Sequence, residues 1–335
     1  MIQSFNNFDQ IKDMDLHIQR LDIAKDIERT IQHKIDRFET VRRFHRNGHI
    51  ALWILYACIT AGFVWLIFIG RTHLDIDITA KATVLFTGIT AGTFAASRAQ
   101  KKKYLRHVKR GLMFTLSQEL NIKYNPTGFF RLGDLYDHLL LPSYDIRLVE
   151  DGFEAVIGER RVQFQEARLI AKHIDVERGK WLSGYVMFQG VVAIIPLNKR
   201  LDHHTLIFSR DYVTRKTAAN MDPRFLPFKP IKMVSRKFQD QFQIYSTSGT
   251  EGHYIFDPSF IERFLEATQP VGAKSVSASF YKDTLAIAIA FDRDMFEFGN
   301  LHTPIDTLAI KQVIDDIAVV ADVVETLNMN PHIGL

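Results

Sequence analysis

The sequence predicts an α+β protein with an N-terminal helix, a two-helix transmembrane hairpin, and a cytoplasmic domain that has a mostly antiparallel sheet and a long C-terminal helix. Three observations predict this class. Residues 50–70 carry no formal charge, and a second apolar run at 78–96 is followed by a basic segment. Beyond it, strand-like segments are grouped without regular βαβ alternation.

The composition is that of a folded protein of about two domains. The chain has 335 residues, of which 47% are hydrophobic and 24% are charged. Its single cysteine, Cys58, cannot form an internal disulfide, and no cluster of Cys and His has the spacing of a zinc module. A formal net charge of +4 is too small to indicate nucleic-acid binding. The composition therefore predicts no metal, no cofactor and no nucleic-acid partner.

Residues 1–48 are predicted to form an amphipathic, coiled-coil-like helix, most clearly from Phe8 to His45. Apolar residues recur every three or four positions at Ile11, Met14, Ile18 and Leu21, and again at Ile27, Ile31, Ile35 and Phe38. Self-association and packing against the chain's own C-terminal domain are both compatible with this stripe. Binding to an anionic membrane surface fits less well, because acidic residues lie between the apolar ones.

Residues 49–97 are predicted to form a transmembrane hairpin. Ile50 to Gly70 are 21 uncharged residues, and a helix of that length is about 31 Å long, close to the thickness of the hydrocarbon core. A second span is expected from Ile78 to Ala96, with Lys81 extending its amine to the interface. The alternative is a re-entrant or peripheral segment, which would place the two ends of the chain on opposite sides of the membrane.

Gly88 and Gly92 form a G-x-x-x-G pattern in the second run. Small residues at this spacing allow two helices to approach closely. We expect these glycines to pack the second helix against the first helix or against a neighbouring copy.

Basic residues flank the hairpin on both sides. Five precede it between positions 34 and 46, and seven follow it within residues 98–110, where no acidic residue occurs. The seven are Arg98, Lys101, Lys102, Lys103, Arg106, Lys109 and Arg110. By the positive-inside rule both termini face the cytoplasm. The basic segment is interpreted as this topology anchor, and binding of anionic lipid headgroups is the alternative.

Residues 111–335 are predicted to form the cytoplasmic α+β domain. Helices are expected at 111–120 and 133–141. Strand signals follow at Phe153 to Ile157, Val162 to Ile170, Tyr185 to Ile195 and Thr205 to Phe208. A proline-rich connector at 221–231 divides the domain into two predicted subdomains.

The second subdomain combines strands and helices. Strands are expected at 242–245 and 253–256, and Asp257 with Pro258 predicts the start of a helix. Ser275 to Tyr281 and Thr284 to Phe291 are predicted to form a hairpin. A last helix, opened by Thr303, Pro304 and Asp306, has the apolar face Ile310, Val313, Ile317, Val320, Val324 and Leu327.

Several short motifs occur in a distinctive order over most of residues 100–335. Their residues are Asp151, Gly158, Glu166, Phe188, Gly190, Phe238, Phe242, Pro258, Phe296 and Phe298, followed by the closing VVETLNMN. In this order the chain resembles a bacterial family of two-pass membrane proteins, domain of unknown function 3137. An acidic pair expected at the first motif is only partly present, as Glu150 and Asp151. The resemblance implies an inner-membrane protein of unassigned biochemistry, often encoded near LemA-type membrane proteins, and it supplies no catalytic residues.

No motif indicates a catalytic or metal site. H-E-x-x-H, the P-loop, G-x-S-x-G and a strand-borne G-x-G-x-x-G are absent from the sequence. Three local groups combine acidic residues or histidines: Asp202, His203 and His204; Asp134, Asp137 and His138; and Asp315, Asp316 and Asp322. We interpret them as an exposed turn, a solvated helix face and the polar face of the last helix, respectively.

The sequence therefore predicts a non-catalytic protein of the bacterial inner membrane, with both termini in the cytoplasm. Its cytoplasmic domain is expected to bind a protein or to oligomerise. The expected partners are membrane lipid and either a second copy or another membrane protein, which is LemA-type by the resemblance alone. Two alternatives stay open: a lipid or small-ligand sensor that uses the basic segment, and a hydrolase around Asp134 with His138 or His203.

Overall fold

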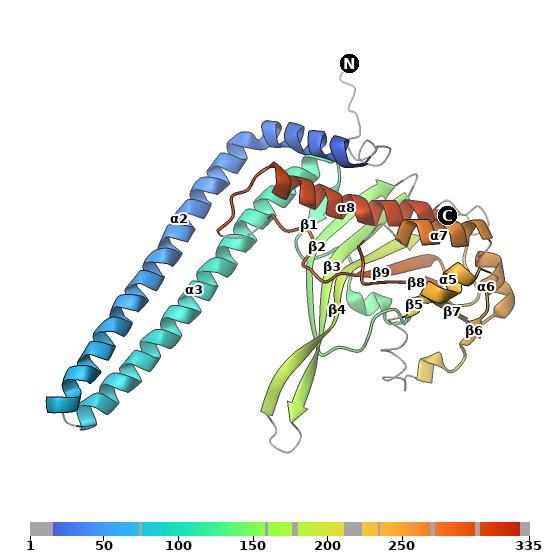
Figure 1. Cartoon of the computed structure of the whole chain (residues 1–335). Helices are drawn as coiled ribbons and strands as arrows, with labels where there is room; N and C mark the ends of the chain where they lie inside the picture. Colours follow the sequence, from blue (N-terminus) through green and yellow to red (C-terminus); the bar gives the residue numbers. More distant parts are fainter. Residues whose placement is uncertain are drawn as a thin grey trace. The chain divides into compact units, whose positions relative to one another are not determined.

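The structure is a computed structural model, shown in Figure 1. It describes residues 16–73, 76–157, 160–175, 180–210, 223–233, 235–256, 258–268, 272–298 and 302–328. The predicted stripe residues Ile11 and Met14, the motif residue Gly158 and the capping residue Asp257 lie outside these ranges. The chain forms two compact units, which we call the helical unit (21–116 and 298–310) and the sheet unit (1–20, 117–297 and 311–335).

Two long helices make up most of the helical unit. Helix α2 (Leu16–His73) has 58 residues and α3 (Ile76–Glu119) has 44. No proline occurs in either helix, so no backbone donor is missing along their length. The predicted boundaries at 48, 97 and 110 all fall inside these helices. The N-terminal stripe and the first apolar run therefore share one helix, and the second apolar run and the basic segment share the other.

Helices α2 and α3 lie side by side and antiparallel, as Figure 1 shows. Their contacts pair Phe38 with Gly111, His49 with Ser97, and Phe63 with Phe86. Each later contact on α2 falls earlier on α3, as an antiparallel pair requires. At Gly111 a Cβ atom would lie 2.3 Å from the Phe38 ring, so the missing side chain permits this close approach.

The apolar stripe of the N-terminal helix is used inside the helical unit. Ile27 and Ile35 are buried, and the half-buried Phe38 packs on α3. The side chains at positions 18, 21 and 31 lie outside the described residues. The sequence predicted that this stripe packs against a second copy or against the C-terminal domain. Phe38 instead packs against α3.

One helical stretch among the described residues, Gln32–Trp65 in α2, is long and apolar enough by length and composition to cross a bilayer. None of its most apolar window is buried inside the structure. The predicted second span in α3 does not meet the same test within the described part of the chain. The antiparallel helix pair is thus observed, whereas its passage through a membrane as two spans is unconfirmed.

The sheet unit is built on one sheet, which has nine strands within the described residues. The strands are β1 (Lys123–Asn125), β2 (Ile146–Ile157), β3 (Arg160–Asp175), β4 (Lys180–Pro196), β5 (Thr205–Ser209), β6 (Lys229–Ile231), β7 (Phe242–Ser246), β8 (Ser275–Tyr281) and β9 (Thr284–Ala290). Their order across the sheet is β1-β2-β3-β4-β9-β8-β5-β7-β6, and every neighbouring pair is antiparallel. The predicted α+β class with mostly antiparallel sheet is confirmed. The sheet continues across 221–231, where the sequence predicted a division.

The remaining helical segments are short, except for the last. They are η1 (Leu132–Leu135), η2 (Pro223–Phe225), α5 (Arg236–Gln241), α6 (Gly249–Ile255), α7 (Pro258–Thr268) and α8 (Thr307–Asn328). Pro258 opens α7 as predicted. Helix α8 begins at Thr307, and Asp306 caps it by accepting a hydrogen bond from the Ala309 amide at 3.0 Å.

Two predicted elements are wrong. The expected helix at 133–141 is one 3-10 turn followed by irregular turns, because Leu132, Leu135 and Leu140 all reach into the core. The expected strand at 253–256 belongs to α6 instead. Ser248 accepts a hydrogen bond from the Glu251 amide and caps that helix, a signal of the S-x-x-E type.

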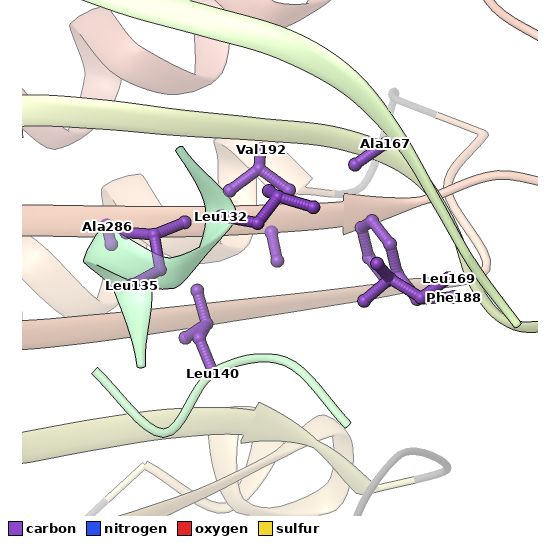
Figure 2. Packing of buried hydrophobic residues seen from close by; sticks show 9 residues of the cluster. Leu132, Leu135, Leu140, Ala167, Leu169, Phe188, Val192 and Ala286 are labelled. Carbon is purple, nitrogen blue, oxygen red and sulfur yellow. The ribbon is translucent and has the colours of Figure 1, made fainter. Parts of the chain in front are cut away.

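The segment 130–141 covers the middle of the sheet with leucine side chains. Figure 2 shows Leu132, Leu135 and Leu140 meeting side chains of β3, β4 and β9. The cluster consists of Leu132, Leu135, Leu140, Ala167, Leu169, Phe188, Val192, Ala286 and Ala288. Alanines on the strands leave room for the leucines, so the irregular segment packs closely without helical structure.

Gly190 provides a test of how tightly the sheet is built. A Cβ atom there would lie 2.0 Å from the Ile289 carbonyl oxygen on β9, a contact that backbone must move to relieve. We expect Gly190→Ala to lower the free energy of unfolding by about 1–3 kcal/mol. Urea unfolding of the solubilised chain measures the change. Gly133→Ala is the control, since nothing lies within 4 Å of its Cβ position; equal midpoints for both variants would contradict the prediction.

Candidate functional site

The acidic and histidine groups that the sequence places on the surface do not assemble into a site. Asp134 and Asp137 are exposed, whereas His138 is only 6% exposed, so the three do not share a solvated helix face. Asp134 instead accepts a hydrogen bond from the Arg131 amide at 3.1 Å. No group of three or more His, Cys, Asp or Glu side chains that could hold a metal ion occurs among the described residues.

The structure brings together two histidines that the sequence separates by 66 positions. His138 follows η1, and His204 lies just before β5. Both reach Ser279 on the neighbouring strand β8: its Oγ lies 2.9 Å from His138 Nδ1 and 2.8 Å from His204 Nε2. All three side chains are buried, and Ser279 has no exposed surface. We call these three residues the His–Ser–His cluster.

Burial controls the charge of this cluster. Desolvation lowers the pKa of His138 from 6.5 to about 4. It also lowers the pKa of His204 to about 3, with the nearby His138 adding a smaller effect in the same direction. Both imidazoles are therefore neutral at pH 7. The Ser279 hydroxyl has one proton, so it donates to one imidazole and accepts from the N–H of the other, which ties the two tautomers together.

Further contacts hold His204 in place. Its backbone N–H donates to Thr247 Oγ1 at 3.0 Å, and its carbonyl accepts from the Thr247 amide at 3.0 Å. The Tyr281 and Phe228 rings lie 4.6 and 5.0 Å from the imidazole, centroid to centroid. The imidazole is thus fixed by backbone on one side and by aromatic rings on others.

The His–Ser–His cluster has the contacts of a buried hydrogen-bond network and lacks those of a serine nucleophile. A serine nucleophile needs its oxygen within reach of a substrate carbonyl, but Ser279 is fully buried and engaged by both imidazoles. Among the described contacts, no carboxylate hydrogen-bonds to either histidine to orient it as a base. Such a network fixes one arrangement of the elements that meet in it.

Sequence reasoning placed these histidines wrongly. His203 is 48% exposed and lies 3.9 Å from Glu251, as an exposed turn predicts. His204 and His138 are buried, which the expected exposed turn and helix face did not anticipate. The sequence does contain a signal for their burial, because His138 precedes three leucines and His204 precedes the apolar strand β5.

A second buried polar group, which we call the acidic clamp, fixes the segment after β9. Asp316 on α8 is 1% exposed and accepts hydrogen bonds from the Phe296 amide at 2.8 Å and from Arg293 Nη1 at 3.0 Å. Glu166 on β3 accepts from the Met295 amide at 2.8 Å. Two consecutive amides are thus held by two carboxylates from different elements. Asp316 belongs to a group that the sequence assigned to a polar helix face, which is wrong for this residue.

The clamp places Phe296 in the core. Its ring is fully buried and lies 4.9 Å from Phe153 and 6.4 Å from Phe164, centroid to centroid. Its φ angle of 56° falls in the left-handed region, which costs energy for a residue with a side chain. The paired amide and the aromatic contacts offset that cost.

The predicted basic and glycine residues lie on α3. The Arg98 guanidinium lies 4.2 Å from the centre of the Phe94 ring, and Arg106 and Arg110 are exposed. The side chains of Lys101, Lys102 and Lys103 lie outside the described residues, and Lys109 is half-buried. A Cβ atom at Gly88 or Gly92 would meet nothing within 4 Å, so the space beside each glycine is open. Lipid binding and packing against a second copy stay predictions for these residues.

Residues 186–329 match the model of a family described as "Protein of unknown function (DUF3137)". This segment is similar to that family. The resemblance predicted from the motifs is thereby confirmed for this segment, whereas Asp151 and Glu166 precede it. The DUF3137 match assigns no activity, and it shows neither the membrane spans nor a LemA-type partner.

Most motif residues within the matched segment are explained by packing. Phe188, Phe238 and Phe242 are buried, and the Phe238 and Phe242 rings lie 5.2 Å apart. Gly190 permits the close approach of β9, and Phe296 is held by the acidic clamp. These motif residues of the matched segment therefore lie in the folded core.

The other comparisons add no function. No curated protein matches the sequence. The crystal structure of the mycobacterial trehalose monomycolate transport factor A, TtfA, matches with 9% sequence identity over 62% of this chain and 93% of that chain, at a TM-score of 0.32. A likeness this distant carries no argument here.

The lowered histidine pKa values predict a loss of stability in acid. Because the folded pKa values lie below the unfolded value of 6.5, the folded state binds fewer protons, and stability falls as the pH drops from about 6.5 toward 4. We expect His138→Phe to remove one proton from this dependence, or about 1.4 kcal/mol per pH unit in that range. Urea midpoints between pH 7 and pH 4 measure it. His203→Phe, at an exposed position, should leave the slope unchanged; an unchanged slope in His138→Phe as well would refute the assignment.

Proposed function

We propose that the protein is a non-catalytic, two-pass protein of the bacterial inner membrane that displays its DUF3137 domain in the cytoplasm for protein binding or oligomerisation. The paired helices α2 and α3 serve as the anchor. The main support for this proposal is the exposed apolar surface of this helix pair.

That surface consists of large apolar side chains that are 43% or more exposed in the structure. It includes Trp53, Ile54, Leu55, Val64, Trp65 and Phe68 on α2, and Val84, Leu85 and Phe94 on α3. Their exposed fractions run from 43% to 78%. Exposed apolar patches of this kind mark protein or membrane contact, and the unbroken apolar length of α2 favours a membrane.

The pairing of the helices supports a second span. The stacked Phe63 and Phe86 rings place the apolar parts of α2 and α3 at the same level along the pair. A membrane that surrounds one of them also meets the other. Lys81 is exposed near the start of α3, where its amine can reach the opposite interface.

Charge supports the proposed direction of insertion. The basic residues precede the apolar run on α2 and follow the apolar run on α3, and the positive-inside rule assigns both of these segments to the cytoplasm. Arg98 also supports the alternative function, a lipid sensor. Its guanidinium lies over the Phe94 ring at the end of the apolar run, where it can contact a lipid headgroup.

The open glycine face supports self-association. Gly88 and Gly92 are exposed and are not used within the helix pair. G-x-x-x-G faces bring transmembrane helices close enough for backbone contact. A second copy of α3 fits this face, and a LemA-type partner is retained only as an expectation from the family resemblance.

Membrane anchorage predicts where the protein is found. The full chain is expected in the membrane pellet after a carbonate wash, with tags at both ends protected from external protease in intact cells. Arginine at both Leu55 and Val64 should release or destabilise the protein, at a cost of about 2.5–3.5 kcal/mol for each charge. Alanine at the same positions is the matched control. Recovery of the unmodified chain in the soluble fraction would contradict the proposal, and exposure of one tag only would contradict the two-pass topology.

Self-association predicts a particle mass above that of the monomer. In mild detergent the chain is expected to be larger than a monomer, and Gly88→Leu with Gly92→Leu should give a monomer because the added side chains separate the helices. Light scattering during gel filtration measures the mass. Gly62→Leu on α2 adds the same bulk at another open position and serves as the control. A monomeric unmodified chain would remove this part of the proposal.

A further inference from the structure

The outer half of strand β4 has a free edge. Strand β4 pairs with β3 along most of its length, but it pairs with β9 only from Gly190 to Pro196. The next hydrogen bond on that edge joins the Phe291 amide to the Gln189 carbonyl at 2.8 Å. No described strand pairs with that edge at residues 180–188, and Figure 1 shows this end of the β3–β4 hairpin extending beyond the neighbouring strands. Backbone donors and acceptors on such an edge are able to pair with another chain.

The side chains described on this edge are apolar and exposed. Tyr185 is 57% exposed, Val186 45% and Met187 43%. Strand β4 contains one charged residue, Lys180, which is its first. Residues 181–188 therefore combine free backbone groups with an uncharged sequence, and they lack the charges that keep edge strands apart.

Other free edges of the same sheet carry charge or proline. The outermost strands β1 and β6 have exposed Lys123 and exposed Lys229, and Pro230 removes a backbone donor from β6. The part of β2 that precedes its pairing with β1 has exposed Arg147 and exposed Glu150. Charge and proline oppose the addition of another strand. The contrast indicates that the edge of β4 is used for a contact.

We propose that the outer edge of β4 pairs with the same edge of a second copy, antiparallel and across a two-fold axis. A two-fold axis brings identical surfaces together, so an uncharged edge meets an uncharged edge without repulsion between like charges. Backbone groups of both copies are then hydrogen-bonded to each other. The exposed apolar side chains of each strand pack against those of the other.

The centre of this pairing is the segment 183–186. Its residues pair regularly with residues 170–173 of β3, whereas register shifts on both sides leave Leu182 and Met187 without a paired residue on β3. Such bulges bend a strand and turn its edge in a new direction. A regular stretch this short buries too little surface to hold a dimer in dilute detergent. The contact therefore acts between copies that are already close.

The proposed function supplies that closeness, and the edge contact rests on it. The membrane and the glycine face of α3 keep copies together and raise the effective concentration of the β4 edges. The edge contact adds a second meeting point, in the sheet unit. The mass in dilute detergent is expected to depend on the glycines alone, so the edge contact is tested in membranes.

Disulfide crosslinking of the full chain in membranes tests the edge contact. Cys58→Ser first removes the single native cysteine, and one cysteine is then placed at each position from Leu182 to Met187 in turn. In a two-fold antiparallel pair, the residue on the axis faces its own copy at about 4.5–5.5 Å between Cα atoms, which permits a disulfide. Oxidation is expected to give a dimer band that is about fivefold stronger at one position than at its neighbours, whose Cα atoms lie beyond about 7 Å.

Two further variants keep the result clear. A Cβ atom at Gly184 would lie 2.6 Å from Ile170 Cγ2, so Ser183→Cys mixed with Tyr185→Cys tests an axis at Gly184 if Gly184→Cys does not fold. Leu226→Cys is the control, because Leu226 is 84% exposed and lies just before β6, several strands away from β4.

A lysine on the edge should prevent the pairing. Tyr185→Lys, combined with the cysteine that crosslinks most, is expected to weaken the dimer band about tenfold, because the axis brings like charges together. Met187→Lys replaces it if position 185 gives the maximum. Leu226→Lys in the same background should leave the band unchanged.

The outcomes separate the edge contact from the proposed self-association. Bands no stronger at 182–187 than in Leu226→Cys would overturn the edge contact, and so would crosslinks to a different protein in place of a second copy. A chain that is dimeric in detergent but gives no crosslink on β4 would remove the edge contact and leave the glycine contact in place. Crosslinks on β4 in a chain that is monomeric in detergent would do the reverse.

Discussion

The apolar surface of the α2–α3 pair is the constraint on which the account depends. Two long helices without proline pair antiparallel through Phe38, His49 and Phe63, yet the pairing leaves large apolar side chains on the outside of both. Burial of apolar area contributes about 25 cal/mol per Å², so a patch of large apolar side chains gains free energy when a membrane or a partner covers it. We propose that a lipid bilayer covers this surface, because a bilayer would surround both helices at once.

In the sheet unit, two networks of paired buried polar groups fix the fold. Ser279 joins two neutral imidazoles, and Asp316 and Glu166 each hold a backbone amide. Removal of one partner from such a buried group costs more than its net contribution, so each network admits few alternatives. The motif residue Phe296 lies in one of these networks, and the motif residue Gly190 lies where the backbone of β9 approaches closely. The motifs are thus explained by packing and backbone geometry without reference to a substrate.

Much of the fold was predictable because it depends on local pattern. The charge-free run at 50–70, the β8–β9 hairpin and the apolar face of α8 all followed from periodicity and composition. The predictions failed where distant parts of the chain decide local structure. Leu132 and Leu140 are drawn onto the sheet and override the helical signal at 133–141, and His138 and His204 meet only through Ser279 on a third element. The residue spacing within one segment does not predict contacts between residues that are far apart in the sequence.

The environment of Cys58 tests the central claim most directly. This single cysteine lies exposed on α2 within the apolar run, so a spin label placed there reports on the outer surface of the helix pair without further substitutions. In lipid nanodiscs, the account predicts that the label is relaxed by dissolved oxygen, which concentrates in hydrocarbon, and is protected from a water-soluble nickel complex. A label that is relaxed by the nickel complex and not by oxygen would show that water covers this surface, and the membrane anchor would then be wrong.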